Sequence, residues 1–442
     1  MEREPTKQEY RGLGRWLLPE HSILGCLLVL PYGSYVALVG LGLFLVWSLL
    51  KRTSAIASLL YRQGWLWLTL GLIFNVLMSY APGESALQSL NFIPFFWFYA
   101  ALAVAIPKFY NPGQTLYRWA LGLVLVSLPI SLRAMVEFYF KAPANIERWA
   151  GASWLDWLYL QPDFGHRADA VFGHPNVLAN YLVIVFGLGL GLCMLYLNQT
   201  RKAPEAVWVY GAVALVLVGI FCSGSRNGLL IAGIQLILFA WCMRRFRLII
   251  WSGLGALLAV LVGVLMWGVG GRSLGEALQT VTLRFDVWRL AFDLINDHPW
   301  IGSGLGTFKL RYEPYSIPIY DYVAHPHNLI LMFAAELGLP MTLLFTGIVG
   351  IIAFRGVRHL FHLPASDPNR FVLAAYFLGF AGHLAFAMFD LSFYDSRINV
   401  LGWLMLAIIQ SSTTLVPALS GSGPKLASPS GGRNTGSALS RP

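Results

Sequence analysis

Long apolar runs separated by short polar stretches recur along the chain from residue 17 to residue 412. The runs are continuous and rich in leucine, whereas strands of a membrane barrel alternate apolar and polar positions. They therefore predict membrane-spanning helices, and we expect an all-α, polytopic membrane protein with about 12 such helices. The predicted spans are Leu17–Leu30, Tyr35–Leu50, Trp65–Tyr80, Ile93–Ile106, Leu116–Ser131, Asn176–Leu197, Ala206–Phe221, Gly228–Met243, Leu248–Trp267, Leu329–Phe354, Val372–Phe389 and Ile398–Ile409.

The composition excludes a soluble enzyme. Hydrophobic residues make up 57% of the 442 residues and charged residues only 12%, against about 25% charged in soluble domains. The net charge is +10, but no basic stripe suggests nucleic acid, so we assign the excess to loops that face the cytoplasm or anionic lipid. The four cysteines lie in apolar segments without a CxxC pair, so we expect neither a disulfide framework nor a metal site.

The basic residues predict the topology. With the spans above, five basic clusters fall on one side, which the positive-inside rule assigns to the cytoplasm: Lys51, Arg52 and Arg62; Lys108 and Arg118; Arg201 and Lys202; Arg244, Arg245 and Arg247; Arg355, Arg358 and Arg370. The basic N-terminal segment joins them only if Pro31-Tyr32-Gly33 is a hairpin turn instead of a kink.

This topology gives three regions. Residues 1–16 form a cytoplasmic segment, residues 17–412 the transmembrane domain, and residues 413–442 a disordered cytoplasmic tail rich in Ser, Gly and Pro. The opposite, outer face carries two long loops, residues 133–175 and 268–327, and the turn Ser223–Asn227. Long loops on a helical scaffold usually carry function, so we expect the active site there.

The second outer loop ends in the segment Ala324-His325-Pro326-His327-Asn328-Leu329, where a span begins. A histidine at the boundary between water and lipid can transfer a proton near neutral pH. The alternative is that the histidine only caps the helix, together with Asn328. The residues alone leave both interpretations open.

Two arginines are candidates for binding an anion. Arg226 follows a polar turn between two apolar spans, where Gly224 and Gly228 allow a tight backbone that suits a phosphate or diphosphate; the alternative is an arginine that reaches the lipid phosphates. Arg284 lies on a predicted amphipathic helix that ends at His298-Pro299, and it has no opposite charge four residues later. The following turn, Gly302 to Gly306, lacks the strand–turn–helix context of a nucleotide site.

The first outer loop adds His174, which is either catalytic or part of a helix start with Pro175 and Asn176. Its aromatic residues, Trp149, Trp154, Trp157 and Tyr159, are typical of an interfacial belt and less often stack on sugars. Asp390 is the most conspicuous acid near the outer end of a span, and we expect it to face the bundle interior. For His383 and Glu336 we expect structural roles.

Taken together, these segments resemble the O-antigen ligase family of lipopolysaccharide ligases and O-antigen polymerases. The resemblance depends on Gly173-His174-Pro175-Asn176, Ser225-Arg226-Asn227-Gly228, the stretch from Arg284 to Gly306, and His327-Asn328 through Glu336-Leu337-Gly338. Their order, and the long loop before His327, agree with the family.

The resemblance implies transfer of a glycan from an undecaprenyl diphosphate carrier to an acceptor, such as lipid A–core, at the outer face of the bacterial inner membrane. It implies that His327 is the base for the acceptor hydroxyl and that Arg226 and Arg284 hold the donor diphosphate, without a metal or other cofactor. His325, His174, Asn328 and Asp390 are expected to support them, and the His325-Pro326-His327 doublet leaves open which histidine acts.

Two alternatives stay open at this point. A polymerase of the same family would differ from a ligase only in its acceptor, which the sequence does not disclose. Some relatives have been described as bicarbonate transporters, and about twelve helices suit a secondary carrier. Carriers, however, usually show repeats and polar groups near the membrane midplane, whereas here the polar groups gather around the outer loops. This distribution favours the enzyme.

Overall fold

The computed structural model describes residues 19–142, 145, 148, 164–199, 204–243, 251, 255, 274–311 and 325–413. Within these ranges the regular elements are all helices, as predicted. They are α1 (Pro19–Val29), α2 (Ser34–Gln63), α3 (Trp65–Met78), α4 (Pro82–Ser89), α5 (Ile93–Ala105), η3 (Ile106–Lys108), α6 (Pro112–Val126), α7 (Leu128–Phe140), α9 (Pro175–Leu197), α10 (Ala206–Cys222), α11 (Arg226–Cys242), α13 (Leu274–Asp297), α14 (Phe308–Arg311), α15 (Leu329–Leu337), α16 (Leu339–His362), α17 (Pro368–Ala387), η8 (Ser392–Tyr394) and α18 (Ser396–Ser412).

The protein is a polytopic helical membrane protein. Six helical stretches of the described chain are long and apolar enough to cross a bilayer: Ser34–Gln63, Pro82–Lys108, Pro112–Phe140, Pro175–Leu197, Leu339–His362 and Pro368–Ala387. Three shorter apolar helices, α3, α10 and α11, accompany them. The predicted span Leu248–Trp267 lies almost wholly outside the described residues, as do the predicted N-terminal segment, the C-terminal tail and the aromatic residues of the first outer loop. The total of twelve stays a prediction.

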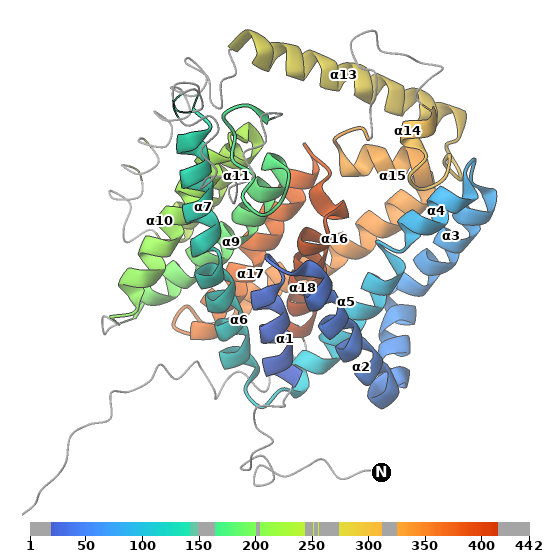
Figure 1. Cartoon of the computed structure of the whole chain (residues 1–442). Helices are drawn as coiled ribbons and strands as arrows, with labels where there is room; N and C mark the ends of the chain where they lie inside the picture. The colour runs from blue at the N-terminus through green and yellow to red at the C-terminus, as the bar shows by residue number, and fades with distance from the viewer. Residues whose placement is uncertain are drawn as a thin grey trace, which may run out of the picture.

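Helix α9 forms the centre of the bundle, and nearly all of its residues are buried. It packs most closely against α17, because Gly187 lies against Gly379 and Gly191 against Ala375 with no room for an added Cβ atom. Small residues let helix backbones approach in this way. From α11, the side-chain amide of Gln235 donates hydrogen bonds to carbonyl oxygens of both α9 and α17. Three helices are thus fixed together beneath the site described below (Figure 1).

The first two apolar runs form a helical hairpin. The backbone N–H groups of Tyr32 and Gly33 both bond to the carbonyl oxygen of Val29. Helix α2 then packs back against α1, with Gly40 close to the Cys26 sulfur. The break at residues 31–33 is therefore a turn and not a kink, which is the condition that the predicted topology required.

Several predicted boundaries differ from the structure, among them the end of the second span, since α2 continues to Gln63 and not only to Leu50. The predicted span Leu329–Phe354 is broken into α15 and α16 at Gly338, whose φ of +80° ends the first helix and whose Cα lies against the backbone of Trp300. The predicted outer loop from Arg133 begins as helix, since α7 continues to Phe140. Arg133 and Glu137 lie one helical turn apart and pair with each other (2.8 Å), which allows polar residues inside this helix.

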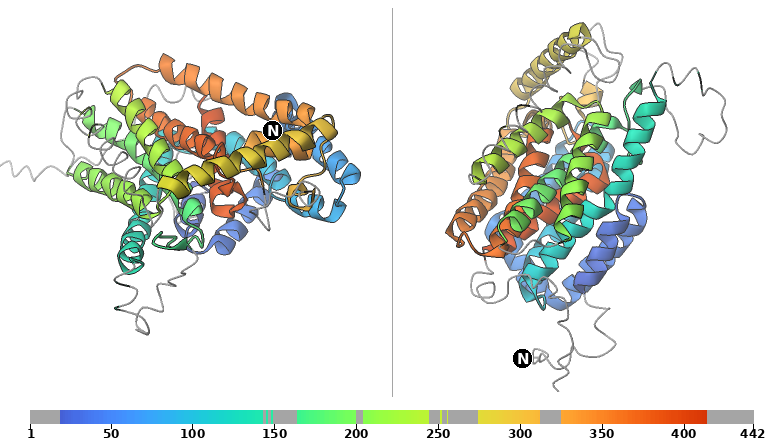
Figure 2. Two further views of the ribbon diagram at one scale, coloured as in Figure 1. Left: turned by 90° about the horizontal axis from the view of Figure 1, so that it is seen from above. Right: turned by 90° about the vertical axis from the view of Figure 1, so that its left-hand side faces the viewer.

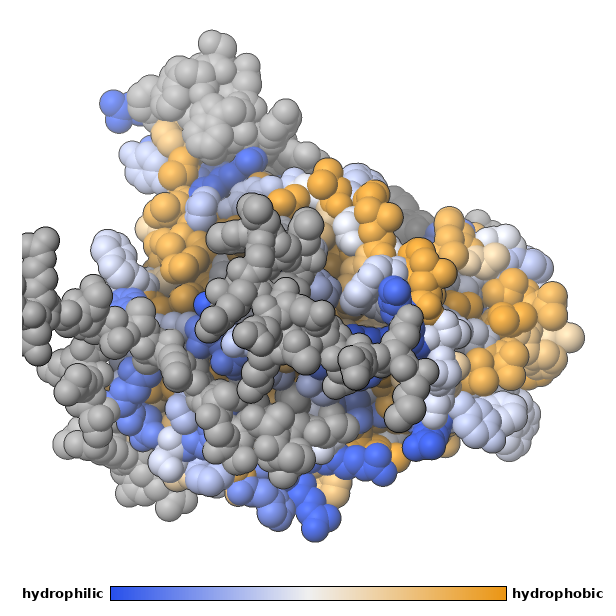
Figure 3. All heavy atoms as spheres, turned by 90° about the horizontal axis from the view of Figure 1, so that it is seen from below, coloured by the Kyte–Doolittle hydropathy of each residue, from blue (hydrophilic) through white to orange (hydrophobic). Residues whose placement is uncertain are grey.

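Helix α13 lies across one end of the bundle, over α15 (Figures 1 and 2). Its predicted apolar stripe, Leu283, Val287, Leu290 and Leu294, is buried, and the helix ends at Asp297, just before His298-Pro299, as predicted. The junction of α5 and α6, which carries Lys108, lies at the opposite end of the bundle (Figure 1). Seen from that end, hydrophilic residues gather toward the middle and lower edge of the surface, beside hydrophobic residues above and to the right (Figure 3).

Candidate active site

The segment His325–Asn328 lies at the start of α15, on the side of the bundle that α13 covers (Figure 2). Asn328 caps this helix, because its side-chain oxygen accepts hydrogen bonds from the N–H groups of Ile330 and Leu331, each 3.0 Å long. Its amide nitrogen donates to the carbonyl oxygen of Met388 (3.2 Å). Asn328 therefore joins the start of α15 to the chain that follows α17. The capping role belongs to Asn328 and leaves the imidazole of His327 for other contacts.

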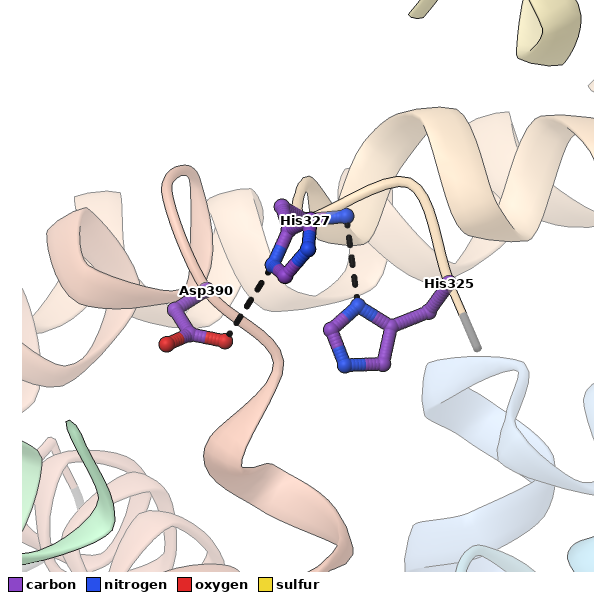
Figure 4. A group of neighbouring side chains, drawn as sticks. All are labelled: His325, His327 and Asp390. Atoms are coloured by element: carbon purple, nitrogen blue, oxygen red, sulfur yellow. Dashed lines mark hydrogen bonds and ion pairs between the residues drawn. The ribbon is translucent and has the colours of Figure 1, made fainter. Parts of the chain in front are cut away.

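His327 faces Asp390 across this junction. Its Nδ1 lies 3.5 Å from Oδ1 of Asp390, and its side chain is 38% exposed, against 9% for the carboxylate (Figure 4). Asp390 is buried, as predicted. His327 has a φ of +53°, a left-handed conformation that costs a non-glycine residue about 1–3 kcal/mol and that clusters at functional sites. Its backbone N–H donates to Nδ1 of His325 (3.3 Å), which fixes this conformation.

His325 and Asp390 differ in charge at pH 7. Burial and the neighbouring His327 together lower the pKa of His325 to about 4, so His325 is a neutral acceptor at pH 7. Burial alone would raise the pKa of Asp390, but contact with His327 outweighs it and the pKa lies at about 2. Asp390 is thus an anion beside His327, while His325 accepts a hydrogen bond from the backbone N–H of His327. This division favours His327 over His325 as the base.

By distance alone, His325, His327 and Asp390 could also hold a metal ion, since their potential ligand atoms lie within 4.8 Å of one another. Two imidazoles and a carboxylate would suit zinc. Several of these atoms already have protein partners, however. Nδ1 of His325 accepts from the His327 backbone, and the Asp390 carboxylate accepts from Leu391 N–H and from the side chain of Asn176. The contacts fit a proton-transfer pair more closely than an open metal site.

Arg226 is the first residue of α11, directly after the turn Ser223–Ser225. Ser225 caps the helix, since its hydroxyl accepts from the N–H of Gly228 (3.3 Å), and Gly224 has a φ of +61°. The predicted tight turn is therefore present. It is also linked to the histidine, because Arg167 bonds the carbonyl oxygen of Ser223 and the side chain of Asn176, which in turn bonds Asp390.

His174 is the N-cap of α9, and its Nδ1 accepts the N–H of Asn176 (3.1 Å). Burial lowers its pKa, and Asp390 and Arg167 both act on it electrostatically. The helix-start interpretation of this motif is thus the one that the structure supports. His174 lies near the His327–Asp390 pair as a structural neighbour.

Arg284 lies on α13, one helical turn before a residue that contacts the histidine segment. Trp288, one helical turn further along, donates its indole N–H to the carbonyl oxygen of Pro326 (2.9 Å), between the two histidines. Arg284 and Trp288 are both half-buried, and residues four apart share a helix face. The structure therefore brings the Arg284 face of α13 to the His325–His327 segment, as the sequence order suggested.

The remaining polar residues singled out from the sequence have hydrogen-bond partners within the protein. The turn Gly302–Gly306 is a tight loop, because the side chain of Asn75 and the carboxylate of Glu336 bond its backbone. Glu336 also accepts the N–H of Phe308 (3.0 Å). His383 is buried beside Asn180 in the bundle.

The sequence interpretation did not identify Arg167, nor the bridging role of Asn176. The signal was available: His166-Arg167-Ala168-Asp169 places three ionisable residues just before an apolar span. Charged residues so close to a span need partners. Their partners, however, are distant in the sequence: Arg167 bonds Ser223, 56 positions away, and Asn176 bonds Asp390, 214 positions away.

Comparison with known proteins supports the family that the sequence motifs resemble. Residues 211–346 match a family model described as O-antigen ligase. The matched segment contains Arg226, Arg284, His325, His327 and Asn328, whereas His174 and Asp390 lie outside it. No curated protein matches the chain. Residues 211–346 are thus similar to the O-antigen ligase family, and the resemblance is confirmed over that segment.

Proposed function

We propose that this membrane enzyme of the O-antigen ligase and polymerase family is a glycosyltransferase that moves a glycan from an undecaprenyl diphosphate carrier to an acceptor hydroxyl. The observation that carries the proposal is the His327–Asp390 pair. A partly exposed imidazole is held in a left-handed backbone against a buried carboxylate. Such a pair is how proteins orient a general base.

The pair assigns the two ring nitrogens. With the Asp390 carboxylate facing Nδ1, the proton stays on Nδ1 and Nε2 accepts the proton of the acceptor hydroxyl. The hydroxyl oxygen then attacks the anomeric carbon of the donor sugar, and the bond from that carbon to the diphosphate oxygen breaks. The electron pair leaves with undecaprenyl diphosphate. Direct attack of this kind inverts the anomeric centre.

The leaving diphosphate needs positive charge. We assign this role to Arg226, at the start of α11, and to Arg284, on the α13 face that meets the histidine segment. A guanidinium suits a diphosphate because its planar fork donates two hydrogen bonds at once. The N-terminus of α11 begins at Arg226 and carries a partial positive charge, which would add to the attraction for the diphosphate. The proposal needs no metal ion.

We place the active site on the periplasmic face of the bacterial inner membrane, with both termini in the cytoplasm. The support is the opposition of the two ends of the bundle: α13 and the histidine segment at one end, and the α5–α6 junction with Lys108 at the other. The sequence does not choose between a lipid A–core acceptor and a growing glycan, so ligase and polymerase stay as two forms of one proposal.

The test uses purified protein in lipid nanodiscs with an undecaprenyl diphosphate-linked glycan and lipid A–core, and products are separated by gel. Glycosylated lipid A–core supports a ligase. Lengthened carrier-linked glycan, made without the acceptor, supports a polymerase. No product from folded protein with several donors would overturn the proposal, and uptake of bicarbonate by proteoliposomes would then support the transporter.

A further inference from the structure

Arg167 is a buried arginine in the segment just before α9, with 5% of its surface exposed. Its Nε donates to the carbonyl oxygen of Ser223 (2.9 Å), and its Nη2 donates to the side-chain oxygen of Asn176 (2.6 Å). The N–H of the next residue, Ala168, bonds the carbonyl oxygen of Cys222 (3.0 Å). One short segment thus holds the end of α10 and the start of α9 together.

Beyond Asn176 the contacts continue to the proposed base. The amide nitrogen of Asn176 donates to Oδ2 of Asp390, whose other oxygen lies 3.5 Å from Nδ1 of His327. The oxygen and the nitrogen of one side-chain amide are therefore both used, one toward Arg167 and one toward Asp390. Because an amide has this fixed polarity, Arg167 determines which way Asn176 points.

The turn that carries Arg226 is fitted over the Arg167 side chain. A Cβ atom at Gly224 would lie 2.8 Å from Cγ of Arg167, and Gly224 has a φ of +61°. Both facts require glycine at this position. Two residues later Arg226 begins α11. A shift of Arg167 would therefore move the turn, and with it the start of α11.

The charges around Arg167 are matched. Lys141 pairs with Asp169 (2.6 Å) and also donates to the carbonyl oxygen of Arg167 (3.1 Å). His174 interacts electrostatically with both Arg167 and Asp390. Through the side-chain amide of Asn176, the guanidinium is also connected to the Asp390 carboxylate. A buried cation is costly unless it has such a link.

Resting on the proposed function, we infer that Arg167 is a positioning residue that keeps two halves of the active site in register. One half is the Ser223–Ser225 turn with Arg226, which we assign to the donor diphosphate. The other is Asn176 and Asp390, which orient the base His327. Arg167 bonds one residue of each half directly, Ser223 and Asn176.

The test compares Arg167→Gln and Arg167→Lys with a matched control, Arg397→Gln, in the nanodisc transfer assay. Arg397 is also an arginine with low exposure; it bonds the carbonyl oxygens of Val171 and Phe172 in the same segment and pairs with Asp395. We expect Arg167→Gln to lower kcat about 10- to 100-fold, as removal of an outer-shell partner commonly does. Arg167→Lys keeps the positive charge but loses the planar guanidinium that donates to both Ser223 and Asn176, so its kcat should lie between those of the wild type and Arg167→Gln. Arg397→Gln should keep the wild-type pH profile.

Two readouts separate positioning from loss of folding. In Arg167→Gln the acidic limb of the pH–activity profile should move, because Asp390 loses its orientation toward His327. Amide hydrogen exchange in residues 222–228 should become faster in Arg167→Gln and stay unchanged in Arg397→Gln, a result that needs no activity at all. The double variant of Arg167→Gln with Asp390→Asn should be little worse than Asp390→Asn alone.

An unchanged pH profile and unchanged exchange in a folded Arg167→Gln protein would overturn the inference, as would fully additive losses in the double variant. These outcomes differ from failure of the proposed function. In that case the wild-type protein itself would make no product, while the exchange experiment would still report on the contact between Arg167 and the turn.

Discussion

Replacing Asp390 by asparagine tests the electrostatics of the site, because it keeps the shape of the side chain and removes its charge. In the proposed reaction His327 becomes positively charged only as it takes the proton, so the attraction to Asp390 grows in the transition state. Loss of such an interaction lowers kcat more than it changes KM.

The size of the effect follows from the contact distance. Two unit charges 3.5 Å apart attract by about 5 kcal/mol at an effective dielectric constant of about 20. Since the His327 side chain is 38% exposed, water screens part of this, and we take about half, 2–3 kcal/mol. That corresponds to a fall in kcat of roughly 30- to 150-fold.

The assay is the initial rate of glycan transfer in nanodiscs as a function of donor concentration and pH. The matched control is Asp395→Asn, because Asp395 caps α18, asparagine caps a helix about equally well, and the charge that this variant removes is paired with Arg397 outside the proposed site. We expect the control to keep the wild-type kcat. If Asp390→Asn transfers glycan as fast as the wild-type protein, with the same pH profile, Asp390 does not orient the base and this reasoning is refuted.

Three further predictions concern the surroundings of the pair. Arg284→Ala should lower kcat about 10²- to 10³-fold, as loss of one charge-stabilising donor does. Arg289, which is exposed on the same helix, supplies the control, and Arg289→Ala should keep the wild-type kcat. Equal transfer rates in the two variants would contradict the diphosphate role of Arg284. The wild-type protein should lose about 2 kcal/mol of folding stability between pH 8 and pH 5, because the folded-state pKa of His325, about 4, lies below the ordinary value of about 6.5, so that acid favours unfolding. His325→Asn should not show this loss. Thermal unfolding at the two pH values measures it, and equal losses in wild type and variant would count against the prediction. Gly338→Ala should destabilise the protein by about 1–3 kcal/mol through its positive φ and its contact with Trp300, whereas Gly347→Ala, in open space within α16, should not; unfolding temperatures of the two variants decide.

Much of the helical architecture could be predicted from sequence, since continuous apolar runs and helical periodicity are local signals. The stripe of α13 and its end before Pro299 are examples. The break at Gly338 was missed although the sequence carries a local signal for it, since Gly338 is followed two residues later by Pro340 and a glycine followed by a proline is typical of a helix end. In the structure the backbone of Gly338 also lies against that of Trp300, a contact that the sequence alone does not reveal.

The candidate site shows the same limit. Histidines and arginines in polar turns stand out from the sequence, and Asn328 beside a span indicated a cap. The pairing of His327 with Asp390 could not be predicted, because it depends on how α15 meets the end of α17. Arg167 and Asn176 were missed for the same reason: their roles are defined by side-chain bonds between segments that only the packed bundle brings together.

The most direct test of the proposed mechanism is the rate of glycan transfer by the His327→Ala protein, with chelator present and with binding of the undecaprenyl diphosphate-linked donor measured in the same nanodiscs. If His327 is the base and the arginines hold the diphosphate, transfer falls at least about 10²-fold while donor affinity stays near that of the wild-type protein. Transfer at the wild-type rate would contradict the central claim, because the reaction would then proceed without His327.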